Sequence, residues 1–141
     1  MPNEIEGKEK LKHGVAATLT GIHAENQALF FECVAKLLED ALPSETQVIR
    51  KGGIFSKKKV EKVTISIKQL RYALEDVGGG SLHPERVRIV HNIALKTESI
   101  PLDMWVDEVS SYVVEKAKTD RSARKALSRI ARRDESRIKQ G

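Results

Sequence analysis

The chain has 141 residues, enough for one domain that buries about two thirds of its unfolded surface and folds without a disulfide or a metal. Its 25 basic and 20 acidic residues give a net charge of +5, and a single cysteine, Cys33, excludes an intramolecular disulfide. No apolar run approaches the roughly 18 residues of a membrane-spanning helix, so the composition predicts a soluble, cytoplasmic protein without a transmembrane segment.

The N-terminal third carries apolar side chains at helical spacing. Residues 1–7 are polar, and we expect them to be disordered. Thr20 and Gly21 interrupt the pattern, because glycine disfavours a helix interior and threonine can cap a new helix. Two alternatives stay open, one kinked helix or two shorter helices that end before Pro43. The apolar positions are Leu11, Val15, Leu19, Ile22, Leu29, Phe30, Cys33, Val34, Leu37, Leu38 and Ala41.

After Pro43 the apolar period changes from 3.6 to 2, which is the period of a β-strand. Short strands are predicted at 46–51 and 70–75. The clearest strand lies between them, where Val63 and its alternate neighbours are apolar and the intervening residues are polar. Lys68 and Gln69 can form a tight turn, so the second and third strands are predicted to make a hairpin.

A fourth, longer strand is predicted from about Arg86. Gly78–Ser81 is expected to be a flexible link before it, and Pro101 ends it because proline donates no ladder hydrogen bond. His91 falls on the apolar face, where we expect a core or sheet-edge imidazole with a backbone partner; a pH-sensitive or binding role is the alternative. The residues expected to share that buried face are Val87, Ile89, His91, Ile93 and Leu95.

Two amphipathic helices are predicted after Pro101. The first carries its apolar stripe from Trp105 to Ala117, and its early acids suit the positive end of the helix dipole. Thr119 and Asp120 can cap the second, whose apolar stripe thins out after Ile130.

These elements together predict an α+β domain. It has an N-terminal helix that is kinked or split, a four-stranded antiparallel meander, and two C-terminal helices packed on one face. We expect the domain to span 8–131, with 132–141 as a basic, frayed end. The open sheet face is expected to be wet or to bind a partner, and it carries Lys62, Thr64, Ser66, Arg71, Arg88 and Asn92.

Three short strings occur in a recognisable order, KGGIFSKKKVEKVTI, then RYAL, then IALKTESIPLDMW. In this respect the chain resembles a widespread type of uncharacterised bacterial domain with a GGxFSKK hairpin and a PLDxW helix start. The resemblance covers roughly residues 24–130. It implies domain boundaries, and that domain type carries no known activity or functional residues.

Chemistry-bearing residues form no catalytic or metal-binding pattern in the sequence. Ser81 does not sit on a nucleophile elbow, and Gly78–Gly80 lacks the lysine and following helix of a phosphate loop. The sequence therefore predicts no enzymatic activity and no cofactor. No two histidines have a metal-ligand spacing such as His-x3-His. The four histidines are His13, His23, His83 and His91.

One candidate binding feature is the loop after the first predicted strand. An apolar tip between basic residues can dock on another protein, including a second copy of the chain, or on an anionic membrane. The alternative is that the apolar tip folds back over the sheet or packs on the first helix. The leading prediction is a non-enzymatic protein-interaction module, such as an adaptor, chaperone-like or regulatory domain. The loop residues expected to bind are Ile54, Phe55, Lys57, Lys58 and Lys59.

The second candidate is the C-terminal sixth of the chain. Residues 119–141 hold eight basic and three acidic side chains, while the rest of the chain holds 17 of each. Nucleic-acid binding is therefore an alternative function, and a solvated helix end is the structural alternative. The residues expected to contact phosphates are Arg121, Arg124, Lys125, Arg129, Arg132 and Arg133.

Overall fold

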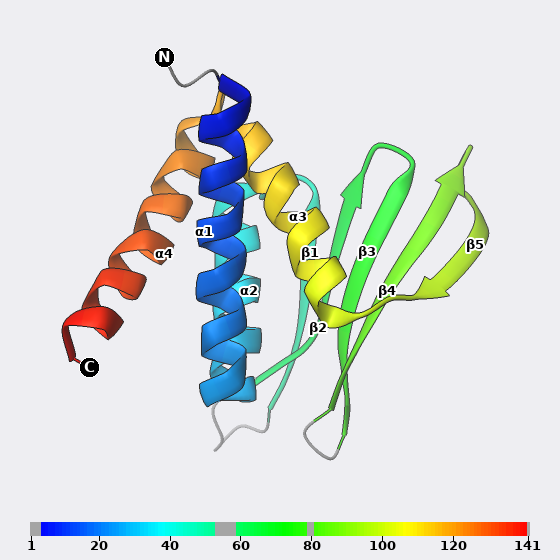
Figure 1. The fold of residues 1–141 in the computed structure, drawn as a ribbon. Helices are drawn as coiled ribbons and strands as arrows, with labels where there is room; N and C mark the ends of the chain where they lie inside the picture. Colours follow the sequence, from blue (N-terminus) through cyan, green and yellow to red (C-terminus); the bar gives the residue numbers. More distant parts are fainter. Residues whose placement is uncertain (1–3, 53–58, 79–80, 141) are drawn as a thin grey trace.

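The computed structural model describes residues 4–52, 59–78 and 81–140, which form four helices and one five-stranded antiparallel sheet (Figure 1). The α+β class and the antiparallel meander are confirmed, because the strands pair in chain order. The sheet has one strand more than predicted. In order, the elements are α1 Glu4–Glu25, α2 Gln27–Ala41, β1 Thr46–Lys51, β2 Lys59–Ile67, β3 Leu70–Gly78, β4 Ser81–Val90, β5 Ile93–Ser99, α3 Leu102–Ala117 and α4 Arg121–Gln140.

The helices lie on one side of the sheet (Figure 1). α2 packs on β1 and β2, and α3 packs on β4. α1 and α4 pack against α2 and α3 rather than on the sheet, so α4 does not share the sheet face with α3 as expected. The core lies between α2, α3 and the sheet, where Phe30, Leu74 and Trp105 are at most 1% exposed.

The N-terminal apolar stripe is split into two helices, which was one of the two alternatives. The break falls at Asn26, not at Thr20 and Gly21. Asn26 is extended, and its side-chain oxygen accepts a hydrogen bond from the Leu29 N–H at 3.0 Å, which satisfies a free donor of the first turn of α2. Thr20 and Gly21 stay inside α1, where the buried Ile22 next to them anchors the helix.

The predicted fourth strand is in fact two strands, β4 and β5, joined by His91 and Asn92. Both residues have positive φ, 52° and 65°, as a two-residue type I′ hairpin turn requires. His91 is therefore exposed at a turn, and the prediction that it shares a buried face is wrong. Ile93 and Leu95 are wrongly predicted too, because they lie beyond the turn and are 62% and 60% exposed.

The two faces of β4 are the reverse of the prediction. Arg86 lies opposite Tyr72, which is buried on the helix-covered face, so Arg86 and Arg88 point toward α3. Val87 lies opposite Arg71, so its side chain belongs to the open face, although only 8% of the residue is exposed. Asn92, expected on the open face, lies in the turn. The other residues expected there do line a pocket of about 540 Å³ on it, namely Lys62, Thr64, Ser66 and Arg71.

Candidate functional site

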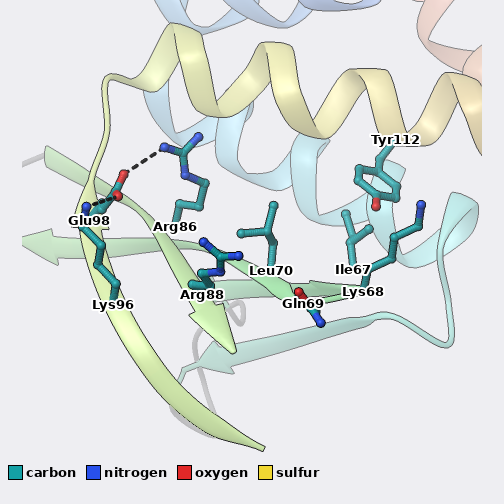
Figure 2. Close-up of a pocket in the computed structure, with 9 residues that line it drawn as sticks. All are labelled: Ile67, Lys68, Gln69, Leu70, Arg86, Arg88, Lys96, Glu98 and Tyr112. Carbon is teal, nitrogen blue, oxygen red and sulfur yellow. Dashed lines mark hydrogen bonds and ion pairs between the residues drawn. The ribbon is translucent and has the colours of Figure 1, made fainter. Parts of the chain in front are cut away.

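A chain of charged hydrogen bonds joins the sheet to α3 around Arg86. Its Nη1 donates to both carboxylate oxygens of Glu108 at 2.8 Å, and its Nη2 donates to Glu98 Oε2 at 2.8 Å. The Tyr72 hydroxyl donates to Glu108 Oε1 at 2.7 Å. Lys96 Nζ lies 3.0 Å from the second oxygen of Glu98. This network, which we call the Arg86 network, ties β3, β4 and β5 to α3, and Figure 2 shows its Arg86–Glu98–Lys96 part.

Contacts within the Arg86 network shift the pKa of three of its members, Tyr72, Arg86 and Glu98. Hydrogen bonds to Glu98 and then Glu108 raise the pKa of Arg86, so the guanidinium stays charged. Burial, followed by the hydrogen bond to Glu108, raises the pKa of Tyr72, which remains a neutral phenol. Lys96 and then Arg86 lower the pKa of Glu98, which remains a carboxylate. These side chains therefore present a defined arrangement of charge.

A cavity of about 670 Å³ opens beside this network, between α3 and the β4–β5 hairpin (Figure 2). Among the described residues that line it, four are basic and one, Glu98, is acidic, which gives a net charge of +3. The apolar part of the wall comes from Ile67, Leu70 and Tyr112. The cavity, which we call the cationic cavity, suits an anion that also has an apolar part. Its basic lining residues are Lys68, Arg86, Arg88 and Lys96.

Arg88 and Lys68 differ from the other two cations of the cavity. Arg86 and Lys96 both pair with Glu98. Among the described residues, neither Arg88 nor Lys68 has an ion pair or a side-chain hydrogen bond. Arg88 extends from β4 toward α3, between Leu70 and the Arg86 network (Figure 2). These two charges are the ones that a bound anion would neutralise.

The free edge of the sheet lies next to this cavity. Within the part of the chain that the structure describes, β5 pairs only with β4, and each of its residues except Glu98 is exposed. Ile93 and Leu95 place two large apolar side chains in solvent on this edge. The strand at the opposite edge, β1, is tied to α2, because Arg50 of β1 donates two hydrogen bonds to Glu39 of α2. β5 is therefore the more accessible edge for another strand.

The predicted loop site lies largely outside the described residues. This applies to Ile54, Phe55, Lys57 and Lys58. Lys59 is described, and it is the exposed first residue of β2, opposite Lys51 of β1. Binding through this loop, whether to a protein or to a membrane, stays a prediction.

The predicted nucleic-acid site lies on α4. Arg121, Arg124 and Lys125 are exposed, and their i, i+3 and i+4 spacing places them on one helix face. Arg129 is exposed as well, but its guanidinium is hydrogen-bonded to Asp40 of α2. Arg132 and Arg133 belong to the same helix, beyond the last residue whose side chain is described.

Sequence reasoning missed the cationic cavity. A signal was present, because Arg86 and Arg88 alternate on one strand, and Lys96 and Glu98 alternate on the next. The turn at His91 and Asn92, together with the register shift between Arg88 and Ile89, folds these pairs onto each other, with Arg88 opposite Lys96 and Arg86 opposite Glu98. The cavity could therefore have been found only by recognising that turn.

Comparisons with protein-family models, curated proteins and solved structures yield no match for this chain. Within 4–52, 59–78 and 81–140, no group of three or more potential metal ligands is found. None of the helices in those ranges is long and apolar enough to cross a membrane. The geometry of the site is therefore the basis for assigning a function.

Proposed function

We propose that the protein is a non-enzymatic interaction module that binds an extended, acidic segment of another protein along β5. The observation that carries the proposal is the exposure of this edge strand, with Ile93 and Leu95 62% and 60% exposed. An edge strand offers unpaired N–H and C=O groups to a partner strand, and apolar side chains on it add contact area. Natural proteins usually protect such edges with charges, prolines or covering loops.

The acidic character of the partner follows from charge. Lys96 is on β5 itself, with a side chain 71% exposed, and Arg88 lies opposite it on β4. A second copy presents both Lys96 and Glu98 on its own edge, whereas an acidic segment presents only negative charges to Lys96 and Arg88. We therefore favour a different protein over a homodimer.

A peptide-display selection tests this proposal even while the natural partner is unidentified. A random 15-residue library is selected on the full chain, and the enriched peptides are measured on Leu95→Lys and on Ile49→Lys. The second variant is the matched control, because Ile49 is 44% exposed on the opposite edge, β1. We expect acidic peptides with alternating apolar residues, whose affinity falls about tenfold in Leu95→Lys and is unchanged in Ile49→Lys.

Three outcomes would contradict the proposal. The enriched peptides could lack acidic residues, or they could bind Leu95→Lys as tightly as they bind Ile49→Lys. Light scattering could also reveal a concentration-dependent dimer that Leu95→Lys abolishes, in which case the occupant of β5 is a second copy. Thermal unfolding of each variant verifies that the fold is retained, as expected for exposed positions.

Nucleic-acid binding by α4 is the second candidate, and a separate observation favours it. Arg121, Arg124 and Lys125 are exposed on one helix face and have no ion-pair partner among the described residues. Such a row of cations can contact successive phosphates. Unlike strand addition at β5, this function predicts a strong dependence of binding on salt concentration.

A further inference from the structure

We propose that the cationic cavity binds a small phosphate-bearing ligand of about nucleotide size. This inference goes beyond the proposed protein partner, because it concerns the cavity between α3 and the β4–β5 hairpin and not the outer edge of β5. It rests on the charge of the cavity, on the arrangement of its walls and on its volume.

The charge of the cavity calls for an anion. Glu98 is already engaged with both Arg86 and Lys96, which leaves Arg88 and Lys68 without a charged partner among the described residues. Glu98 does not neutralise all the cations that line the cavity, so an anion that enters is attracted to them. A phosphate group carries up to two negative charges and can accept several hydrogen bonds at once, so it neutralises such a cluster better than one carboxylate.

The Arg86 network orients part of this cluster in advance. Arg86 is fixed by Glu108 on α3, and Glu98 connects it to Lys96 on β5. Because these groups are already ordered, less conformational entropy is lost when a ligand binds. Arg88 completes the wall with a planar guanidinium, which suits bidentate contact with phosphate oxygens.

The rest of the cavity indicates that the ligand has an organic part. Figure 2 shows the Arg86–Glu98–Lys96 group at one end and Tyr112 with Ile67 at the other, with Arg88 and Leu70 between them. A volume of about 670 Å³ is in the range of small-molecule sites and far exceeds the space needed by inorganic phosphate. The ring of Tyr112 can contact a base or another flat apolar group, while the phosphate lies toward Arg88.

Titration calorimetry of the full chain with four probes tests the inference. The probes are inorganic phosphate, pyrophosphate, adenosine diphosphate and adenosine. We expect adenosine diphosphate to bind most tightly, pyrophosphate and phosphate to bind more weakly, and adenosine not to bind at a concentration of about 1 mM. Arg88→Gln should weaken adenosine diphosphate about tenfold, because one charged contact is lost.

A matched control separates a built site from a general effect of positive charge. Arg71→Gln removes the same charge from the neighbouring strand β3, but on the open face of the sheet. It should leave the affinity unchanged. Equal weakening by Arg71→Gln and Arg88→Gln would overturn the inference, as would the absence of any binding at about 10 mM adenosine diphosphate.

The edge variant distinguishes this inference from the proposed function. Leu95→Lys should bind adenosine diphosphate as the unaltered chain does or slightly more tightly, since it changes the outer strand without removing a cavity cation. If the unaltered chain binds adenosine diphosphate but selects no peptides, only the protein-partner proposal fails. If it selects peptides but binds none of the phosphate probes, only the ligand inference fails.

Discussion

Removing the hydroxyl of Tyr72 tests the energetic role of the Arg86 network. Tyr72→Phe keeps a ring that is 2% exposed and deletes only the donor to Glu108, whose hydrogen bond measures 2.7 Å. Hydrogen bonds to charged groups contribute about 1.5–3 kcal/mol, and Glu108 keeps Arg86, so we expect a loss of about 1.5 kcal/mol. With an unfolding entropy of about 2.1 cal/mol/K per residue over 141 residues, this loss lowers Tm by about 5 °C.

Urea unfolding measures the loss of stability and thermal unfolding measures the fall in Tm, both followed by circular dichroism. Tyr112→Phe is the matched control, because the Tyr112 hydroxyl has no hydrogen-bond partner among the described residues and its ring is only half-buried. The control should change stability by less than about 0.5 kcal/mol. Equal effects of the two variants, or no loss in Tyr72→Phe, would refute the view that this network stabilises the fold.

Two further predictions concern charges elsewhere. The hydrogen bond with Arg50 lowers the pKa of Glu39 below its ordinary value of 4.5. The ion pair therefore stabilises the fold above pH 4.5, and this stabilisation is lost as the pH falls through the pKa of Glu39 in the folded state. The difference in urea midpoint between the unaltered chain and Glu39→Gln should therefore be present at pH 7 and shrink as the pH is lowered below 4.5; a constant difference would count against it. If α4 binds duplex DNA, replacing Arg121, Arg124 and Lys125 by glutamine should reduce the log–log salt slope by up to about 2.7. Absence of any DNA shift at low ionic strength would exclude that function.

The sequence predicted the elements whose signals are local. The alternation around Val63 predicted β2, and the turn at Lys68 and Gln69 is confirmed, with Lys68 at a φ of 54°. Asp120 caps α4 as expected, because its carboxylate accepts hydrogen bonds from the N–H groups of Ser122 and Ala123. Capping and alternation depend on neighbouring residues, so a single sequence contains them.

The β4–β5 hairpin was missed for a physical reason. A turn of two residues by itself shifts the alternation of apolar and polar side chains by one residue, but the register shift between Arg88 and Ile89 restores it, so Val87 to Leu95 have the pattern of one continuous strand. The residues at the turn, His91 and Asn92, also lack the glycine that usually marks a type I′ turn. The N-terminal break was misplaced in a similar way, because Gly21 is the more obvious breaker but Asn26 is the residue that caps.

The candidate site depends on register, which local patterns do not specify. Whether Arg86 or Val87 faces α3 is decided by the pairing of β4 with β3, where Arg86 lies opposite Tyr72. The alternation in β4 is compatible with either face, and the apolar residue was assigned to the core. A cationic cluster on the helix-covered face became visible only when the partners of Arg86 were known, namely Glu98 and Glu108.

Amide hydrogen exchange of the full chain, with and without an acidic peptide selected on it, tests the central claim most directly. Strand addition places the backbone of the peptide beside β5, so the amides of residues 93–99 should exchange more slowly in the complex. The amides of β1, at the opposite edge, should be unchanged. Protection confined to β1 or to the helices, with no change in residues 93–99, would contradict the assignment of β5 as the binding surface.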